Sequence, residues 1–464
     1  MTAFGWTDRE VRAALDLAPA PALDTVTYRE ISTDSRSIQA GDLFVALTGE
    51  NFDGHDYVAQ ALSRGAAGAV VSRSMDLADT PVYRVADTRE ALGALARHRR
   101  RALPARVVGI TGSAGKTTAK NFTRGALSTS LKVHATAGNL NNQVGLPLTL
   151  LAAPEDAEVV VVEMGTNEPG EIEILTRIAE PEIGMVTTVG ETHLEKLGSV
   201  DGVLAEKLEL LRGLGDDGTA IVGDEPPVLP EEARKVRPDV RVAGWSERAD
   251  PDLRPEHPRH DERGRYEFGW RGEDVALAVP GRHTVVNALL ALAVADLMGV
   301  TPRAAAAGVA DVEPAAMRGE VRTVGGLTML IDCYNASPQS VRAALETLEA
   351  LPATRGRVAV LGTMLELGSH SDQLHDDVLA DALGRDVDHF VAVGEFAGAA
   401  RRSTDALRAM REGRLVISDD VESAYARLAE YLRDGVTVLL KASRGVRLER
   451  LLEPLERDFG GGGA

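Results

Sequence analysis

The feature that most constrains this fold is an apolar run followed by a glycine-bearing turn, a lysine and two threonines: VVGITGSAGKTTAKN, residues 107–121. In such a turn the glycines let backbone N–H groups face phosphate oxygens, the lysine reaches the β- and γ-phosphates, and a hydroxyl binds magnesium. The spacing is the short form G-x-x-G-K-T, because Ile110 stands where the longer Walker form needs glycine. We therefore expect a strand, a phosphate loop and a helix, with ATP or GTP as the ligand. The expected nucleotide-binding residues are Gly112, Ser113, Ala114, Gly115, Lys116, Thr117 and Thr118.

A phosphate loop alone fits kinases, motors, transporters and ligases, but charge and cysteine content exclude other classes. The chain has 51 basic and 70 acidic side chains, and its net charge of −19 repels nucleic acid and anionic membranes. The single cysteine, Cys333, excludes an internal disulfide and a zinc site built on several cysteines, and we expect a packed thiol. No basic segment with an apolar core opens the chain, and no apolar run approaches the roughly 18 residues of a membrane span. We expect a cytoplasmic monomer without nucleic-acid binding or membrane insertion.

Apolar runs that alternate with helical patterns predict two doubly wound α/β units. Strand candidates in the first are Val107–Ile110, Val159–Met164, Ile183–Val189 and Ala220–Val222. Those in the second are Thr328–Ile331, Val358–Leu361, His389–Val393, Leu415–Ile417 and Val436–Leu440, with helical patterns at Ser340–Ala350 and Val421–Arg433. This alternation is typical of parallel sheets with crossover helices, as in P-loop ATPase and Rossmann-like domains.

The N-terminal part has a different pattern and predicts a small mixed α/β unit. Its strand candidates are Ile31–Ser37, Asp42–Leu47 and Ala67–Ser72. Because 464 residues suggest about three domains, we expect boundaries near 86 and 315, giving domains 1–86, 87–315 and 316–464. Within the second domain, the polar stretch Pro251–Arg265 predicts an exposed loop or hairpin arm, whereas Thr284–Met298 predicts a buried helix. The closing GGGGA predicts a flexible tail.

Three further residues are candidates for chemistry beside the phosphate loop. Glu163 ends a predicted strand, where doubly wound sheets place their ligands, and a carboxylate there can hold magnesium. His193 follows the next predicted strand, and its position favours a functional role over that of a solvated loop histidine. Lys207 lies in a helical stretch and, by pattern alone, is a solvated helix lysine.

Taken together, the motifs resemble those of the Mur ligases, the ATP-dependent enzymes that add amino acids to the peptide stem of the cell-wall precursor. The resemblance covers nearly the whole chain, and its motifs appear in order. They are TDSR (33–36), GSAGKTT (112–118), GNLNNQVGLPLTLL (138–151), EMGTNEPGEI (163–172), ETHLEKLGSVDGVLAEK (191–207), PGRHTVVNALLA (280–291), MRGE (317–320), DCYNASPQS (332–340), GTMLELG (362–368) and KASRG (441–445). DCYNASP with MLELG resembles the branch that adds D-alanyl-D-alanine to UDP-N-acetylmuramoyl-tripeptide through an acyl phosphate.

The resemblance implies ATP and Mg²⁺ as cofactors and assigns roles to matching positions. Lys116 and Thr117 would hold the phosphates and one magnesium ion, and Glu163 and His193 a second, with Lys207 as a further ligand if carbamylated. Residues implied near the ATP base and between domains are His283, Asn287, Arg318 and Asp332. Residues implied near the muramoyl peptide are Asn139, Asn141 and Asn142, and those near its uridine diphosphate are Ser35, Arg36, Thr48 and Gly49. Residues implied near the nucleotide or the incoming dipeptide are Tyr334, Asn335, Ser337, Lys441, Ser443 and Arg444.

Several of these positions have local structural explanations, and the chain departs from the family pattern at others. The three asparagines are typical of turns, and Ser337 is typical of a helix N-cap. Cys333, Thr363 and Ala442 stand where Asp, Asp and Gly are common, and Ser337 where Asn is common; we expect Thr363 to alter amine recognition most. Two alternatives stay open: a related ligase with another acceptor, and a nucleotide- or UDP-sugar-binding protein that forms no peptide bond.

Overall fold

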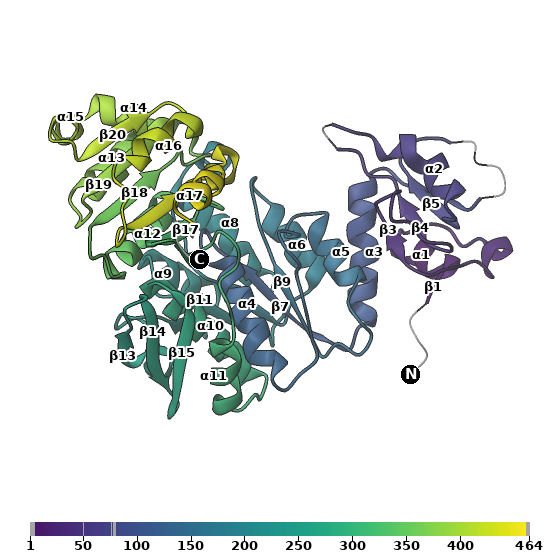
Figure 1. Ribbon diagram of the computed structural model, residues 1–464. Coiled ribbons are helices and arrows are strands. Elements are labelled where there is room, and N and C mark those ends of the chain that lie inside the picture. Colours follow the sequence, from purple (N-terminus) through teal and green to yellow (C-terminus); the bar gives the residue numbers. More distant parts are fainter. Residues whose placement is uncertain (1–4, 50, 76, 78–79, 461–464) are drawn as a thin grey trace.

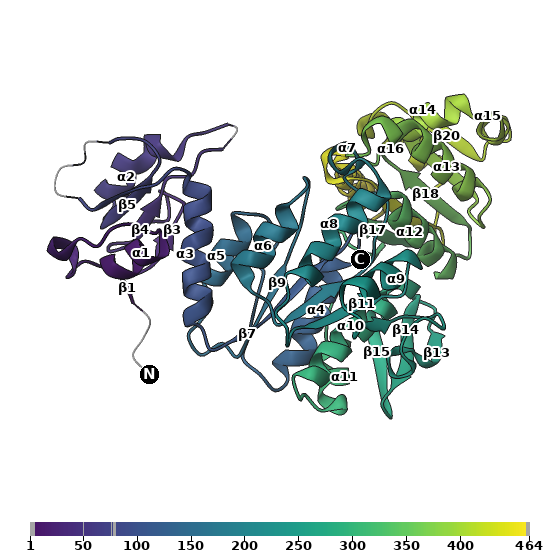
Figure 2. The same ribbon diagram turned by 180° about the vertical axis from the view of Figure 1, so that it is seen from behind.

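The computed structural model describes residues 5–49, 51–75, 77 and 80–460, and the chain in it forms three α/β units in a row (Figure 1). The N-terminal unit lies at one end, the C-terminal unit at the other, and the central unit between them, as the reverse view also shows (Figure 2). The predicted three-domain α/β class is confirmed. Residues 461–464 of the predicted flexible tail lie outside the described residues. Within the described ranges, no helix has the length and apolar character needed to cross a bilayer.

The N-terminal unit contains a four-stranded parallel sheet of short strands. In spatial order the strands are β3 (Ile31–Ser32), β4 (Leu43–Val45), β5 (Gly68–Val71) and β6 (Val82–Arg84). A two-stranded ribbon and two helices accompany the sheet: β1 (Trp6–Thr7), β2 (Thr27–Tyr28), α1 (Asp8–Ala14) and α2 (Val58–Ser63). Helix α3 (Thr88–Ala102) follows and packs between this unit and helices of the central unit. The strand predicted over Ile31–Ser37 stops at Ser32, because the Asp34 carboxylate accepts the backbone N–H of Arg36 at 2.9 Å and closes a turn.

The central unit is a six-stranded parallel sheet in the order β12-β11-β10-β7-β9-β8. Its strands are β7 (Arg106–Thr111), β8 (Val133–Ala135), β9 (Val159–Glu163), β10 (Ile183–Val186), β11 (Thr219–Gly223) and β12 (Arg241–Ala243). The crossover helices are α4 (Lys116–Ser128), α5 (Gly145–Leu151), α6 (Glu171–Ala179), α7 (Leu194–Leu197), α8 (Val200–Arg212) and α9 (Val228–Val236). Strand β10 ends earlier than predicted, because the Thr187 hydroxyl turns to the phosphate loop and donates to the carbonyl of Ala114 at 2.5 Å.

An antiparallel sheet and two helices complete the central unit. The sheet consists of β13 (Glu256–His260), β14 (Arg265–Trp270) and β15 (Glu273–Pro280), and the helices are α10 (Arg282–Leu297) and α11 (Pro302–Ala310). Every residue of β13 is exposed, which confirms the hairpin arm predicted around it. Helix α10 carries buried residues all along its length and packs on α4, as its apolar sequence predicts.

The C-terminal unit has a second six-stranded sheet, in the order β16-β17-β21-β18-β19-β20. Its strands are β16 (Glu320–Val324), β17 (Leu327–Asp332), β18 (Arg357–Leu361), β19 (His389–Val393), β20 (Leu415–Ser418) and β21 (Thr437–Lys441). Only β16 is antiparallel, and the sequence analysis did not anticipate this edge strand. The helices are α12 (Pro338–Ala350), α13 (Ser371–Leu383), α14 (Glu395–Arg402), α15 (Thr404–Arg411), α16 (Val421–Ala429) and α17 (Leu452–Phe459). Helix α16 ends before the predicted Arg433, ahead of a turn in which Gly435 has φ +89°.

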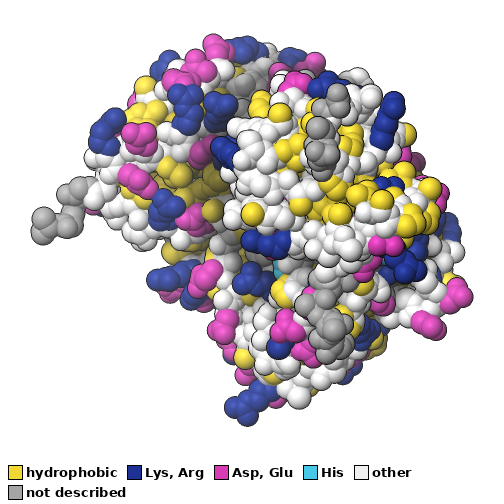
Figure 3. Space-filling model, turned by 90° about the vertical axis from the view of Figure 1, so that its right-hand side faces the viewer, with side chains coloured by type: hydrophobic (Ala, Val, Ile, Leu, Met, Phe, Trp, Pro, Cys, Tyr) yellow, Lys and Arg dark blue, Asp and Glu magenta, His cyan; other side chains and the backbone are white. Residues whose placement is uncertain are grey.

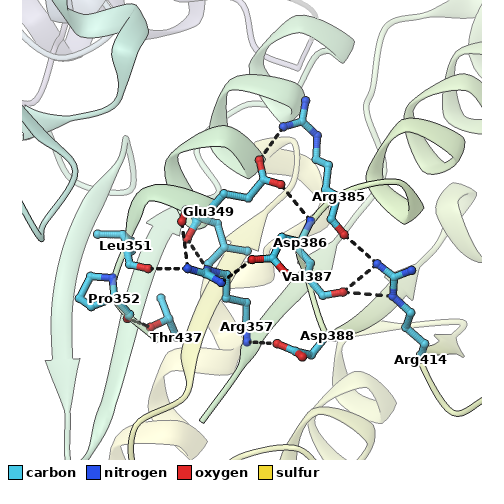
Figure 4. Close-up of polar contacts among 11 residues, drawn as sticks. Glu349, Leu351, Pro352, Arg357, Arg385, Asp386, Val387, Asp388, Arg414 and Thr437 are labelled. Carbon is cyan, nitrogen blue, oxygen red and sulfur yellow. Dashed lines mark hydrogen bonds and ion pairs between the residues drawn. The ribbon is translucent and has the colours of Figure 1, made fainter. Parts of the chain in front are cut away.

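A network of arginines supports the C-terminal unit at the amino ends of its strands (Figure 4). The Arg357 guanidinium donates to the carbonyls of Leu348, Glu349 and Leu351 at the end of α12, at 3.0–3.2 Å. The Arg414 guanidinium donates to the carbonyls of Leu383, Arg385 and Val387 at the end of α13, at 2.8–3.1 Å. These carbonyls lie at or just after the ends of the two helices, where intrahelical donors run out, so the two arginines help to cap α12 and α13.

The central and C-terminal units share one hydrophobic core. Leu194 and Leu197 of the central unit belong to the same buried cluster as Met364 and Leu367 of the C-terminal unit. The N-terminal unit has separate clusters, one of which packs against Val144, Leu148 and Leu151 of the central unit. The central and C-terminal units are therefore packed directly against each other, and the site between them is formed in this arrangement.

Candidate active site

A cavity of about 660 Å³ lies between the central and C-terminal units, at the carboxyl ends of both parallel sheets. This is where open α/β sheets bind their ligands. It brings together most of the site residues predicted from sequence, which come from both units. Those lining it are Ser113, Ala114, Gly115, Lys116, Thr117, Thr118, Asn139, Asn141, Asn142, Glu163, His193, His283, Asn287, Arg318, Asp332, Tyr334, Asn335, Ser337 and Lys441.

The phosphate loop connects β7 to α4 as predicted. Its two glycines have positive φ, +148° at Gly112 and +82° at Gly115, which favours glycine at both positions. A Cβ at Gly115 would lie 2.6 Å from Oδ1 of Asn287, so the loop passes close to α10. Lys116 Nζ donates to the carbonyl of Gly112 at 2.6 Å, and burial lowers the pKa of this amine. The loop therefore holds its lysine beside the N-terminus of α4, where backbone N–H groups attract anions.

Glu163 is the centre of a polar cluster at the end of β9. Its carboxylate accepts hydrogen bonds from the Thr117 hydroxyl at 3.0 Å and from the Asn141 amide at 2.9 Å. Lys120 Nζ lies 3.5 Å from the same carboxylate, and both side chains are buried. Lys120 was missed by the sequence analysis, although its place one helical turn after Lys116 puts the two lysines on one face of α4. The hydroxyl and the carboxylate are oxygen donors that suit Mg²⁺.

Lys207 lies on α8 and is completely buried, contrary to the solvated lysine that its helical pattern predicts. Its Nζ has no hydrogen-bond partner in the structure. Burial holds the pKa of this amine well below its ordinary value, and the charge of Lys116 lowers it further. A lowered pKa favours the neutral, nucleophilic form of an amine, which is the form that reacts with carbon dioxide.

The residues present fit magnesium rather than a transition metal. Across residues 5–49, 51–75, 77 and 80–460, no group of three or more His, Cys, Asp or Glu side chains forms a metal cluster. Mg²⁺ does not need such a cluster, because it is bound through one or two carboxylates, water and substrate phosphates. The Thr117 hydroxyl and the Glu163 carboxylate, 3.0 Å apart, provide oxygen donors of this kind.

His193 follows β10 and lies at the border of the two units. Its backbone is in the left-handed region, with φ +54°, and its side chain is mostly buried. Nδ1 lies 2.6 Å from Oε2 of Glu366, which belongs to the GTMLELG segment of the C-terminal unit. Nδ1 itself has no hydrogen-bond partner by geometry, but the close approach of His193 lowers the pKa of the Glu366 carboxyl. This pair was not anticipated, because its members are far apart in the sequence.

The C-terminal wall of the cavity has its own fixed polar groups. Asp332 and Lys441 end adjacent parallel strands, and Lys441 Nζ donates to the Asp332 carboxylate at 2.6 Å and to the carbonyl of Asn335 at 3.0 Å. The Arg318 guanidinium lies 3.9 Å from the ring centroid of Tyr334. Ser337 caps α12, as its local pattern predicts.

Several predicted site residues do not line this cavity. Gly112 and Lys207 are not among the lining residues, and Ser443 is buried, where its hydroxyl accepts the N–H of Leu365 at 3.0 Å. Arg444 is half-exposed beside Glu449, 3.3 Å away. Those predicted to bind uridine diphosphate are confined to the N-terminal unit: Ser35, Arg36, Thr48 and Gly49.

The face of the N-terminal unit shows hydrophobic side chains gathered among charged ones (Figure 3). Phe52 and Tyr57, with 58% and 45% of their surface exposed, belong to this unit. Phe52 packs at the turn of Gly49, where a Cβ would lie 3.2 Å from the Phe52 ring. Arg36 is 83% exposed and forms a two-point ion pair with Asp34. Of the predicted uridine diphosphate residues, Arg36, Thr48 and Gly49 are thus exposed and Ser35 is buried, and none of the four lines the cavity at the phosphate loop.

The departures from the family pattern fit the structure. Cys333 is fully buried, and burial raises the pKa of its thiol to about 12, which confirms the packed, unreactive cysteine. Ala442 is buried and is not among the residues with positive φ, so alanine is accommodated there without strain. The Thr363 hydroxyl accepts the N–H of Glu395 at 3.0 Å, at the start of α14. Thr363 therefore has a helix-capping role of its own.

Comparisons with known proteins agree with this architecture. Three family profiles match: "Mur ligase family, catalytic domain" over residues 27–100, "Mur ligase middle domain" over 110–295, and "Mur ligase, glutamate ligase domain" over 317–444. UDP-N-acetylmuramoyl-tripeptide--D-alanyl-D-alanine ligase of Bacillus subtilis (strain 168) is 35% identical, with 94% of each chain covered. The protein of that name from Escherichia coli (strain K12) is 33% identical, with 93% of this chain and 95% of that protein covered.

Two solved structures show the same arrangement. MurF from Acinetobacter baumannii superposes with a TM-score of 0.88 at 30% identity, covering 98% of this chain and all of that one. MurF from Thermotoga maritima in complex with ADP superposes with a TM-score of 0.81 at 30% identity, covering 93% and 98%. Profiles, sequences and structures agree along nearly the whole chain, and the protein belongs to the Mur ligase family.

Proposed function

We propose that this protein joins D-alanyl-D-alanine to UDP-N-acetylmuramoyl-tripeptide and hydrolyses ATP to ADP and phosphate in doing so. The product is UDP-N-acetylmuramoyl-pentapeptide, a precursor of peptidoglycan. The observation that carries this proposal is the cavity itself: a phosphate loop and a buried carboxylate on one wall face a second parallel-sheet edge on the other. The relatives that match over nearly their full length are named for this reaction.

The chemistry explains why one cavity must receive three substrates. A carboxylate is a poor electrophile, so the terminal carboxylate of the tripeptide must first accept the γ-phosphoryl group of ATP. The amine of D-alanyl-D-alanine then attacks the acyl phosphate, phosphate leaves with the C–O bond electrons, and the amine loses a proton. An acyl phosphate is lost to water in an open site, so we expect the shared core of the central and C-terminal units to exclude water around it.

The residues of the central unit have roles in the first step. Lys116 neutralises charge on the transferring phosphoryl group, and the backbone N–H groups of the phosphate loop bind its oxygens. Thr117 would hold one magnesium ion and Glu163 with His193 a second, and Lys207 would be a further ligand if it is carbamylated. Magnesium supplies Lewis-acid stabilisation of the phosphate charge. Asn141 positions Glu163 through its hydrogen bond of 2.9 Å.

The remaining residues bind and orient the substrates. We assign the ATP base and ribose to His283, Asn287, Arg318 and Asp332, which lie on both walls of the cavity. Asn139, Asn141 and Asn142 are assigned to the muramoyl peptide, and Ser35, Arg36, Thr48 and Gly49 to its uridine diphosphate end. Tyr334, Asn335, Ser337, Lys441, Ser443 and Arg444 are assigned to the nucleotide or the dipeptide. The corresponding domains are 1–86 for the UDP-sugar substrate, 87–315 for ATP and 316–464 for the dipeptide, in a monomer acting in the cytoplasm.

Phosphate release tests the function directly. Full-length protein with ATP and Mg²⁺ is given the UDP-muramoyl-tripeptide alone, D-alanyl-D-alanine alone, or both. We expect release only with both substrates, together with a mass gain of one dipeptide on the UDP-linked substrate. Slow ATP turnover that is indifferent to the added amine would instead support a nucleotide-binding regulator. Turnover with another amine alone would support a related ligase.

A further inference from the structure

The segment 188–192, which follows β10 in the central unit, is hydrogen-bonded to the phosphate loop. The backbone N–H of Ser113 donates to the carbonyl of Thr188 at 2.8 Å. The buried Ser113 hydroxyl accepts the N–H of Gly190 and the hydroxyl of Thr192, both at 3.0 Å. Because these bonds engage both the backbone and the side chain of Ser113, the conformation of the phosphate loop depends on the position of this segment.

One side chain of the C-terminal unit contacts the same segment. Gln339, in the first turn of α12, donates from Nε2 to the Thr188 hydroxyl at 2.9 Å. The Thr188 hydroxyl in turn donates to the carbonyl of Glu225 at 2.9 Å. A hydroxyl has a single proton, and here Glu225 accepts it, so the group that Gln339 presents to Thr188 must be an N–H donor. The surroundings therefore fix the direction of this hydrogen bond.

The other end of the Gln339 amide has no such contact. Its Oε1 is buried and accepts no hydrogen bond from the part of the chain that the structure describes. A Cβ at Gly190 would lie 2.9 Å from this oxygen, so the amide packs closely against the segment. A buried acceptor without a donor destabilises the folded state, and methionine would fill a similar space without that penalty. Stability alone does not account for glutamine at this position, whereas its hydrogen bond to Thr188 does.

Two hydrogen bonds in series thus connect the C-terminal unit to the phosphate loop. Gln339 holds the side chain of Thr188, and the carbonyl of Thr188 holds the N–H of Ser113. A second contact across the same border lies farther along the chain, where His370 Nε2 is 3.3 Å from the carbonyl of Gly198. The Gln339 contact therefore differs from a general docking contact, because it is bonded to a residue that itself holds the loop.

We propose that Gln339 is a positioning residue for nucleotide binding: it holds Thr188 and thereby keeps the phosphate loop in its phosphate-binding conformation while the C-terminal unit is docked. This inference rests on the use of ATP in the proposed function. Gln339 acts through Thr188 and Ser113 and not by touching the nucleotide. Since a single hydrogen bond carries the effect, its size is about 3- to 10-fold in nucleotide affinity.

ADP affinity tests the proposal without requiring turnover. ADP is titrated calorimetrically, with Mg²⁺ present, into full-length wild-type protein and Gln339→Met. We expect the Kd for ADP to rise by about 3- to 10-fold in the variant. The midpoint of urea denaturation should stay equal or rise, because the unpartnered oxygen is removed. A glutamine with only a structural role would instead lower stability and affinity together, and an unchanged Kd in Gln339→Met would overturn the proposal.

A double-mutant cycle shows whether Gln339 acts through Thr188. Thr188→Val removes the hydroxyl with little change in side-chain volume. In the Thr188→Val background, Gln339→Met should have no further effect on the Kd for ADP, because the bond between the two side chains is already lost. Additive losses would overturn the positioning role, since Gln339 lines the cavity and would then contact the nucleotide directly.

His370→Ala is the matched control for loss of a contact between the same two units. It removes the approach to the carbonyl of Gly198 and leaves Gln339 and Thr188 in place. We expect the Kd for ADP to stay within about twofold of the wild type. An equal loss of affinity in His370→Ala and Gln339→Met would overturn the proposal, because docking in general would then determine the affinity.

The outcome is separable from that of the proposed function. If Gln339→Met weakened ADP binding as expected but wild-type protein formed no pentapeptide product, the ligase assignment alone would fail. If product formed and all variants bound ADP equally well, only the positioning role would fail. In steady-state assays of Gln339→Met, KM for ATP should rise by the factor seen for ADP, while KM for D-alanyl-D-alanine stays within about twofold.

Discussion

Polar side chains gather at both the amino ends and the carboxyl ends of the strands in this protein. The two ends differ in how many of those polar groups have hydrogen-bond partners. At the amino ends in the C-terminal unit, Arg357 and Arg414 donate to carbonyls at the ends of α12 and α13, and both contact the loop after α13, Arg357 through Asp386 and Arg414 through the carbonyls of Arg385 and Val387 (Figure 4). At the carboxyl ends, Lys207 Nζ is buried with no partner, and Lys116 contacts one carbonyl beside an open cavity.

The difference shows that polar density alone does not identify a functional site. The amino-end network gives backbone carbonyls at the helix ends additional charged donors, so it stabilises the folded state. The central unit instead keeps a desolvated amine at Lys207 and, in the cavity wall, a lysine with a single carbonyl partner at Lys116, and both cost stability unless a ligand or modification completes them. Removing residues from the two regions should therefore have opposite effects on stability and activity.

The largest effect is expected at the phosphate loop. Lys116→Ala should lower turnover by at least about 10³-fold, because the ammonium that neutralises the transferring phosphoryl group is lost. The free energy of unfolding should change by no more than about 1 kcal/mol, since one hydrogen bond is removed. Phosphate release and urea denaturation measure the two quantities. Lys132→Ala, at a 66% exposed lysine, is the control, and normal turnover in Lys116→Ala would refute the phosphate-loop assignment.

Replacing Lys207 should separate stability from activity most clearly. Lys207→Met removes a buried amine without a partner, so the free energy of unfolding should stay equal or rise by about 1 kcal/mol. Turnover should fall by about 10²-fold, because no carbamate can form to bind magnesium. Activity of wild-type protein should also drop in buffer freed of carbon dioxide and recover with bicarbonate. A Lys207→Met variant with full turnover would show that the amine is only structural.

The opposite result is expected at the amino ends of the strands. Arg357→Ala removes the hydrogen bonds from the guanidinium to the carbonyls of Leu348, Glu349 and Leu351 and should lower the free energy of unfolding by about 2 kcal/mol. Turnover of the folded fraction should be unchanged, since the network lies away from the cavity. Arg408→Ala, which removes an exposed ion pair with Asp405, should change stability by less than about 0.5 kcal/mol. If Arg357→Ala lowered the turnover of the folded fraction and left the free energy of unfolding nearly unchanged, the comparison between the two regions would be wrong.

The smallest effect is expected at Thr363. Thr363→Ala removes the acceptor for the N–H of Glu395 at the start of α14 and should cost about 1 kcal/mol of stability. Because this hydroxyl is already engaged in the cap, KM for D-alanyl-D-alanine should stay within about twofold. Denaturation and initial-rate measurements check both. A large rise in KM would instead indicate that Thr363 contributes to the dipeptide site, as the family pattern suggests.

Much of the fold follows from local sequence. The apolar runs and helical patterns locate most strands of both large sheets, because a parallel strand buried on both faces must be apolar over its whole length. Edge strand β16 does not follow this pattern. Three of its five residues are polar and at least partly exposed: Glu320, Arg322 and Thr323. Strand ends were less predictable where a side chain closes a turn, as Asp34 does.

The sequence by itself determined the phosphate loop, the acidic end of β9 and the order of the α/β units, because each is a contiguous pattern with a local physical cause. Only the tertiary structure decided that Lys207 is buried without a partner, that Lys120 approaches Glu163, and that the uridine diphosphate residues lie away from the main cavity. Only the tertiary structure also showed that His193 lies beside Glu366. Such contacts link segments far apart in the chain, and their geometry depends on how whole units pack, which no local pattern encodes.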